Sequence, residues 1–125
     1  MGDKGIPDDG LFHHFCFTWS NENGDYKFWL DGEVVGSGSD FQTGTMIDYG
    51  GIVVVGQDQD SLGGGFEPSQ SWAGEVSGLN VWGEVRSDTD IVAEFQECLV
   101  TEGSIIQWYQ LYDKDSLHGN VCVFP

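Results

Sequence analysis

Two aromatic segments joined by a strong turn sequence constrain the fold of this chain more than any other feature. In residues 12–20, Phe15, Phe17 and Trp19 alternate with small or polar residues, which is the period of a β-strand. An Asn-Gly pair follows, which accepts positive φ at little cost, and residues 26–30 then form a second extended segment. The pattern predicts consecutive strands joined by a tight turn.

The rest of the chain predicts more strands and a single helix. The helix is expected over residues 87–97, where Ser87 can act as the N-cap and acidic residues favour the positive helix end. Further strands are expected at 33–35, 52–55, 72–85, 105–111 and 120–124. The fold class is therefore all-β and antiparallel with one short helix, in which residues 1–11 are a lead-in segment and residues 12–125 are the domain.

The charge of the chain excludes two classes of partner. It has 21 acidic residues against 4 basic ones, for a formal net charge of -17. Nucleic-acid binding and anionic membrane surfaces both require Lys and Arg, so neither partner is expected. No stretch approaches the roughly 18 apolar residues of a membrane span. Most of the carboxylates are explained by solvation, but the scarcity of basic residues leaves a metal cation as a partner for some of them.

Cysteines and histidines give little sign of a transition-metal site. Cys16, Cys98 and Cys122 form no C-x-x-C pair, which argues against structural zinc. Cys98 and Cys122 are able to close one loop, which leaves Cys16 as a free buried thiol, an intermolecular partner or a residue whose partner is absent from the chain. His14 is better explained as a structural strand residue than as a ligand, and His13 has no third ligand nearby in the sequence.

The segment that offers chemistry runs from residue 57 to residue 70 and reads QDQDSLGGGFEPSQ. Its oxygen-bearing side chains include Asp58, Asp60, Glu67 and Gln70, and three consecutive glycines allow a sharp reversal between them. Calcium takes about six to eight oxygen ligands, so this loop meets much of that demand. An acidic, glycine-rich loop is more often simply solvated, and the residues alone leave both interpretations open.

Two segments resemble the pentraxin family. The run His14-Phe15-Cys16-Phe17-Thr18-Trp19-Ser20 is similar to the family signature, His-x-Cys-x-(Ser or Thr)-Trp-x-(Ser or Thr), at every defined position. The run from Gly56 to Ser71 is similar to the calcium loop of C-reactive protein and serum amyloid P component, and the flanking segments agree from about His13 to the C-terminus.

The resemblance implies a flattened two-sheet jelly roll of the concanavalin A and laminin G type, found in secreted, cyclic oligomers that bind ligands through calcium. Carried over by position, Asp58, Asp60, Glu67 and Gln70 would give side-chain oxygens to calcium and Gln59 a backbone carbonyl. Asp58 replaces a Glu that the family often has, which shortens the side chain by one methylene.

The resemblance also implies departures. About half of the family sandwich should precede His14, so this chain is expected to be the C-terminal half of a domain that is truncated at its N-terminus. The absent half normally supplies the partner of Cys16, an Asp-Asn pair for calcium and most of the apolar ligand pocket. By comparison with longer relatives, Cys98 and Cys122 are expected to form an added disulfide.

These expectations define a function. The chain is expected to be a secreted, non-catalytic, calcium-dependent recognition module for a phosphorylated or carbohydrate head group, and to form homo-oligomers. Trp72 flanks the acidic loop and is the candidate ligand contact, whereas the other four tryptophans lie at core-like strand positions. The alternative is a metal-independent extracellular adhesion or assembly module of the laminin G-like fold. A glycosidase is disfavoured, because the strand-borne Glu-x-Asp-x-x-Glu pattern is absent.

Overall fold

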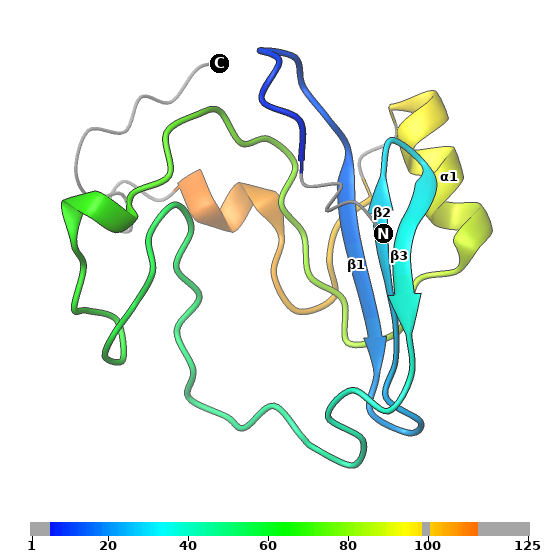
Figure 1. Ribbon diagram of the computed structural model, residues 1–125, viewed down its shortest axis with the longest axis horizontal. Helices are drawn as coiled ribbons and strands as arrows, with labels where there is room; N and C mark the ends of the chain where they lie inside the picture. Colours follow the sequence, from blue (N-terminus) through cyan, green and yellow to red (C-terminus); the bar gives the residue numbers. More distant parts are fainter. Residues whose placement is uncertain (1–5, 99–100, 113–125) are drawn as a thin grey trace. The chain divides into compact units, whose positions relative to one another are not determined.

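The computed structural model describes residues 6–98 and 101–112. These residues group into two compact units, which are a sheet–helix unit (up to Thr45 and from Gly78 onward) and a loop unit (residues 46–77). In chain order the elements are β1 (Phe15–Ser20), β2 (Asp25–Leu30), β3 (Glu33–Gly38), η1 (Pro68–Gln70), α1 (Asp88–Glu97) and η2 (Trp108–Tyr112) (Figure 1). None of the described helices has both the length and the apolar character needed to cross a lipid bilayer.

The three strands form one antiparallel sheet in the order β1-β2-β3. The turn between β1 and β2 contains Gly24, whose φ of +67° suits the glycine of the Asn-Gly sequence. The turn between β2 and β3 contains Asp31 at φ 50° and Gly32 at φ +77°. The first turn falls at the Asn-Gly pair, as predicted, and the second falls between the predicted segments 26–30 and 33–35. The three strands confirm the predicted extended segments, with β3 running three residues beyond its predicted end.

The register places the alternating side chains of β1 and β2 on two different faces. Phe17 pairs with Phe28, and their ring centroids are 4.8 Å apart, whereas Cys16 pairs with Trp29 on the opposite face. On the Cys16 face, Thr18 is 8% exposed and Trp29 is 3% exposed. The hydrophobic core of the sheet–helix unit therefore lies on this face.

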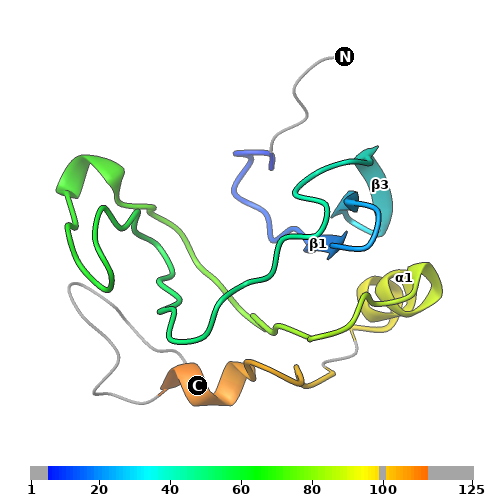
Figure 2. The ribbon, with the colours of Figure 1, turned by 90° about the horizontal axis from the view of Figure 1, so that it is seen from below.

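Helix α1 lies beside the sheet (Figures 1 and 2). It is on the Cys16 face, because Lys27, which pairs with Thr18 on that face, forms an ion pair with Asp88 of the helix. The ring of Phe95 approaches the ring of His14, with centroids 6.1 Å apart, and it also approaches Gly32 closely. Ile91 of the helix is completely buried. The apolar stripe of the helix thus covers the side of the sheet that carries Trp29.

The ends of α1 follow from its sequence. The Ser87 hydroxyl accepts a hydrogen bond from the backbone N–H of Asp90 at 3.1 Å, as expected for an N-cap, and Asp88 and Asp90 lie in the first turn. At the other end Cys98 adopts the left-handed conformation with φ 49°, which terminates the helix. The predicted helix and its cap are confirmed.

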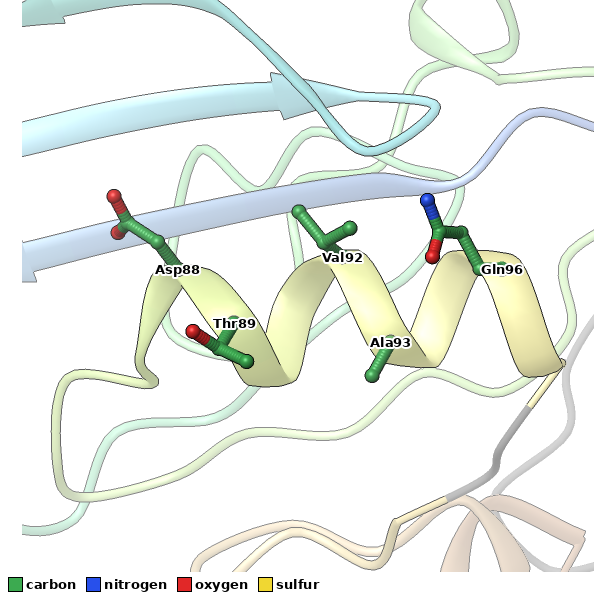
Figure 3. A pocket seen from close by; sticks show the side chains of 5 residues that line it. All are labelled: Asp88, Thr89, Val92, Ala93 and Gln96. Carbon is green, nitrogen blue, oxygen red and sulfur yellow. The ribbon is translucent and has the colours of Figure 1, made fainter.

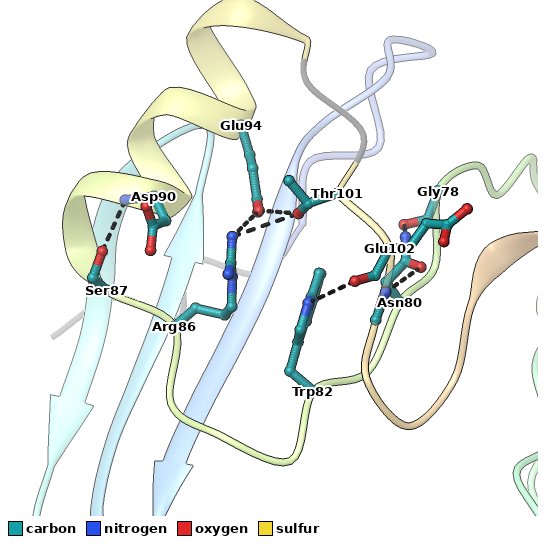
Figure 4. Close-up of polar contacts among 10 residues, drawn as sticks. Gly78, Asn80, Trp82, Arg86, Ser87, Asp90, Glu94, Thr101 and Glu102 are labelled. Carbon is teal, nitrogen blue, oxygen red and sulfur yellow. Dashed lines mark hydrogen bonds and ion pairs between the residues drawn. The ribbon is translucent and has the colours of Figure 1, made fainter.

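A polar network fastens α1 to the segments before and after it (Figure 4). Arg86 Nη2 donates to Glu94 Oε1 at 2.6 Å, and the same oxygen accepts a hydrogen bond from the Thr101 hydroxyl. The Arg86 guanidinium also lies over the Trp82 ring, 5.1 Å from its centroid, and Trp82 Nε1 donates to the carbonyl of Glu102 at 3.1 Å. This network holds together three segments that are separate in the sequence.

The opposite face of the sheet, which we call the aromatic face, consists of Phe15, Phe17, Trp19, Tyr26 and Phe28. Phe15, Phe17 and Phe28 remain 39–48% exposed, although their rings contact one another. An apolar sheet face normally packs against a second layer. In the residues that the structure describes, the sheet–helix unit supplies a layer for one face only.

Three predicted strands are not present. Residues 52–55 are irregular, and Ile52, Val53 and Val55 are 48–58% exposed. Residues 72–85 form no strand beyond an isolated bridge between Val81 and Ile106, and 105–111 overlaps the 3-10 helix η2. A strand needs a neighbour to pair its backbone, and among the described residues these segments have none apart from that bridge. The strand predicted at 120–124 lies outside the described residues.

The Arg86–Glu94 pair generates a stability prediction. Both side chains are largely buried, at 21% and 11% exposure, so replacing Glu94 with Gln leaves a desolvated guanidinium without its counter-charge. We expect Glu94→Gln to lower the free energy of unfolding by about 2 kcal/mol in a urea titration. The matched control is Asp88→Asn, because the Lys27–Asp88 pair is 40% and 62% exposed and should contribute less than about 1 kcal/mol. Equal losses in the two variants would contradict this assignment.

The turn at Gly32 generates a second prediction. A Cβ on Gly32 would lie 2.8 Å from the Phe95 ring, whereas Gly44 has a similar φ of +74° and nothing within 4 Å. Gly44→Ala should cost about 1 kcal/mol through backbone strain alone. Gly32→Ala should cost about 1–3 kcal/mol more, because α1 must shift away from the sheet. Thermal unfolding of the two variants measures the difference, and identical midpoints would show that Phe95 moves aside freely.

Candidate metal site

The loop unit folds back on itself between residues 56 and 72. Gln57 and Ser71 form an antiparallel bridge, and the N–H of Trp72 donates to the carbonyl of Gly56 at 2.9 Å. Further along, Ser61 and Gly64 exchange two backbone hydrogen bonds of 3.2 and 2.9 Å. The reversal that the glycine run predicts is therefore present.

Glycine is required where the returning limb passes the outgoing one. Gly65 has a φ of +77°, and a Cβ on it would lie 2.8 Å from the Asp60 Cβ and 3.1 Å from the Asp60 backbone nitrogen. No other residue fits in that space without displacing Asp60. The close approach places the chain that leads to Glu67 directly beside Asp60.

Two glutamine side chains hold the folded loop. The Gln57 amide nitrogen donates to the carbonyl of Glu67 at 2.9 Å and to the Ser71 hydroxyl at 2.5 Å. The Gln59 amide nitrogen donates to the carbonyl of Ile52 at 2.9 Å, and its oxygen accepts from the N–H of Gly63 at 3.0 Å. Both the nitrogen and the oxygen of the Gln59 side chain are thus engaged within the loop, and a metal contact through its backbone carbonyl stays a prediction.

The expected ligand side chains lie on both limbs of this loop. Asp58 and Asp60 are on the outgoing limb, where Asp58 is exposed and Asp60 lies against Gly65. Glu67 precedes η1, its Oε2 accepts a hydrogen bond from the Ser69 hydroxyl at 3.4 Å, and its carbonyl accepts from the N–H of Gln70 at 3.0 Å. Within residues 6–98 and 101–112, no three His, Cys, Asp or Glu side chains converge on one point that could hold a metal ion.

The donor set nevertheless suits calcium in its chemistry. The expected ligands all offer oxygen, which is the atom that calcium prefers, and they lie on two limbs that backbone bonds hold side by side. Gln57, which is outside the expected ligand set, joins the two limbs through its amide nitrogen, and its buried side-chain oxygen has no hydrogen-bond partner among the described residues. Sequence reasoning missed this residue, because its role in joining the limbs becomes visible only once Ser71 and Glu67 are placed beside it.

Trp72 lies at the end of the returning limb. Its side chain is 54% exposed, and its ring covers the backbone of Gly74, where a Cβ would come within 2.7 Å of the indole. The other tryptophans are less exposed, since Trp29 is buried and Trp19, Trp82 and Trp108 are half-buried. Trp72 is therefore the most exposed of the five tryptophans, while its contact with a ligand stays a prediction.

The remaining candidate groups lie in the sheet–helix unit. His13 is held by Asp31 and Asp9, and His14 packs beside Phe95. Burial raises the pKa of the Cys16 thiol, and the nearby Glu94 carboxylate adds to the effect. A thiol with a raised pKa is a poor nucleophile at neutral pH.

The predicted disulfide between Cys98 and Cys122 has only one end in the described residues. Cys98 is exposed at the C-terminal end of α1. Cys122 lies outside the described residues, so the pairing stays a prediction.

A shallow hollow of about 380 Å³ lies on the surface of α1 (Figure 3). All of its lining comes from this one helix: Asp88, Thr89, Val92, Ala93 and Gln96. Its one ionisable side chain, Asp88, is paired with Lys27 at 2.7 Å. The hollow offers neither a nucleophile nor a free acid–base group.

Comparisons with known proteins agree on one family. A model of the Pentaxin family matches residues 3–125. The chain is 35% identical over 102 residues to the "Sushi, von Willebrand factor type A, EGF and pentraxin domain-containing protein 1" of Rattus norvegicus, which covers 80% of this chain and 3% of that protein. It is 38% identical over 120 residues to C-reactive protein 1.1 of Limulus polyphemus, which covers 89% of this chain and 50% of that protein.

A solved structure agrees with these sequence comparisons. The native heptameric SAP-like pentraxin from Limulus polyphemus matches with a TM-score of 0.71 and 36% identity, over 77% of this chain and 45% of that chain. The chain spans half or less of the length of each of these relatives. The family model and the shared fold together establish that the chain belongs to the pentraxin family.

Proposed function

We propose that this chain is a calcium-dependent recognition domain of pentraxin type, in which the loop of residues 57–70 holds the cation. Pentraxins are non-enzymatic recognition proteins, so the proposed function is ligand binding. The observation that carries the proposal is the folded loop itself. Backbone bonds and the Gln57 side chain hold its two oxygen-rich limbs together, although the chain offers no lysine or arginine between Lys27 and Arg86 to neutralise them.

The proposed ligands are the side-chain oxygens of Asp58, Asp60, Glu67 and Gln70 and the backbone carbonyl of Gln59. Like charges held near one another repel, and a divalent cation removes that repulsion. The cation would therefore bring the limbs into a single defined conformation. When bound, it would supply a positive centre for an anionic or hydroxyl-rich group of a ligand.

The proposed ligand is an extracellular molecule with a phosphorylated or carbohydrate head group. Trp72 supports this, because its exposed ring lies on the limb that returns from the acidic loop. An aromatic ring of this kind offers an apolar stacking surface next to a charged site. Secretion of the protein is part of the same proposal.

The aromatic face supports a jelly-roll sandwich as the complete fold. Phe15, Phe17 and Phe28 form an uncharged surface that a second sheet would bury at the usual separation of about 10 Å. We propose that this sandwich assembles into homo-oligomers, in line with the heptameric state of the solved Limulus pentraxin.

A second candidate function is a metal-independent adhesion or assembly module. The exposed aromatic face favours it, because apolar patches of this kind mark protein–protein contacts. The two functions differ in their response to chelator. A stable oligomer that forms equally in chelator and in calcium, measured by sedimentation velocity, would favour assembly without metal.

The calcium proposal predicts a ligand-induced gain in stability. A calcium concentration about 100 times the Kd should stabilise the folded protein by about 2.7 kcal/mol, and a chelator should reverse the gain. We expect the double variant Asp60→Asn with Glu67→Gln to lose this thermal shift. The matched control, Asp48→Asn with Glu75→Gln, removes two exposed acids from the same unit and should keep it. A wild-type protein whose unfolding ignores calcium contradicts the proposal.

The role of Gln57 gives a separate prediction. Gln57→Met removes the bonds to Glu67 and Ser71 without removing any proposed ligand, so the limbs are less well prepared for the ion. We expect calcium affinity, measured by isothermal titration calorimetry, to fall by about ten-fold. Gln96→Met on the surface of α1 is the control and should leave the affinity unchanged. An unaltered affinity in Gln57→Met would remove this residue from the site.

A further inference from the structure

His13 occupies a position between two carboxylates that belong to different segments. Its Nδ1 lies 2.7 Å from Asp31 Oδ2 in the turn between β2 and β3, and its Nε2 lies 3.1 Å from Asp9 Oδ1 in the lead-in. The His13 side chain is only 13% exposed. The imidazole therefore bridges residues 6–12, which precede the sheet, and a turn 18 residues further along the chain.

Each carboxylate is fixed independently of His13. Asp31 Oδ1 accepts a hydrogen bond from the N–H of His14 at 2.9 Å, and the Asp31 N–H donates to the carbonyl of His14 at 2.8 Å. Asp9 Oδ1 accepts from the N–H of Leu11 at 3.0 Å. The Asp31 carboxylate is therefore fixed by the backbone at the start of the sheet, whereas the Asp9 carboxylate is fixed by a short local turn in the lead-in.

The number of protons on the ring decides whether both contacts exist together. A neutral imidazole has one donor and one acceptor nitrogen, and an ionised carboxylate only accepts. Two carboxylates on opposite ring nitrogens both receive a hydrogen bond only when the ring is protonated. In the neutral form, one nitrogen lone pair faces a carboxylate oxygen and repels it.

The charged surroundings of His13 are simple. Asp9 and Asp31 face the ring directly, and His14 acts weakly on Asp31. Among the described residues, no lysine or arginine forms an ion pair with these groups, since Lys27 is paired with Asp88 and Arg86 with Glu94. The Phe95 ring of α1, which approaches His14 and Gly32, carries no charge.

We propose that His13 is a proton-dependent clasp, which fastens residues 6–12 (the described part of the lead-in together with Phe12) to the turn between β2 and β3 when its imidazole is protonated and releases them when it is neutral. The Asp9 contact is the one that opens, because Asp31 remains tied to the backbone of His14. The direction in which the chain enters β1 is thereby fixed in mildly acidic solution and free in alkaline solution.

The electrostatics agree with the geometry. Hydrogen bonds that the imidazole donates to Asp31 and then to Asp9 raise the pKa of His13 above 6.5. The pKa of Asp9 is lowered below 3.8 by the Leu11 N–H and then by His13, and the pKa of Asp31 is lowered below 3.8 by His13 and then by the His14 N–H. The contribution of the imidazolium is complete below pH 6.5 and is lost as the pH rises through the raised pKa of His13. The contribution of the carboxylates is complete above pH 3.8 and is lost as the pH falls through their lowered pKa values. The clasp is therefore strongest between about pH 4 and pH 6.5.

Nuclear magnetic resonance of the full chain in chelator tests the clasp without interference from calcium. Imidazole signals give the pKa of His13, and the backbone {¹H}–¹⁵N NOE of Leu11 and Phe12 reports motion of the lead-in. We expect the NOE of both amides to fall as the pH rises, with a midpoint equal to the pKa of His13. Asp31→Asn and Asp9→Asn should each shift the pKa of His13 downward, Asp31→Asn by more, and His13→Asn should abolish the pH step.

Asp8→Asn is the matched control. It removes one negative charge from the same segment, and Asp8 has no hydrogen bond or ion pair within residues 6–98 and 101–112. It should leave the pKa of His13 and the pH step unchanged. A shift as large as that of Asp9→Asn would assign the effect to overall charge and overturn the proposal. A lead-in whose NOE ignores the titration of His13 would overturn it as well.

Discussion

The burial of one face of a three-stranded sheet beneath a single helix is the constraint on which the rest of the sheet–helix unit depends. Trp29 and Thr18 are buried on the face of the sheet beside which α1 lies, and Ile91 is the helix residue that is fully buried. The Arg86–Glu94 pair holds the helix in that place from its flanks. Because one helix covers only one face of the sheet, Phe15, Phe17 and Phe28 of the aromatic face stay exposed. Side chains alternate between the two faces along each strand, so the same strands supply both the buried core and this apolar surface.

Short sequence motifs correctly predicted those parts of the fold that depend only on residues close together in the chain. The Asn-Gly turn, the alternation in β1 and the Ser87 cap each act within a few residues, and each is present in the structure. The strands expected at 52–55 and 72–85 depend on pairing with distant segments. Their β-branched and aromatic residues favour a strand, but a strand also needs a neighbouring strand to pair with its backbone N–H and C=O groups, and these residues do not supply one. Sequence alone therefore overestimated the strand content of these segments.

The candidate site was predictable to a similar degree. The glycine run predicted the reversal, which is present, and the position of Trp72 beside the loop marked it as the candidate ligand contact, whose side chain is exposed. The roles of Gln57 and Gln59 could not, because an amide side chain gives no sign in the sequence of which carbonyl it will contact. Whether the carboxylates converge depends on side-chain torsions, which a pattern of residue types does not determine, and within the described residues no three of them form a group that could hold a metal ion.

The loop unit behaves as a polyelectrolyte, because it carries acidic side chains and no basic ones. Its five acidic side chains are Asp48, Asp58, Asp60, Glu67 and Glu75, and it contains no lysine or arginine. Charges on a solvated loop interact over the Debye length, about 8 Å at physiological ionic strength and about 30 Å at 0.01 M. The unit should therefore swell in dilute buffer and contract in salt, so its dimensions depend on the surrounding electrolyte even when no ion is specifically bound.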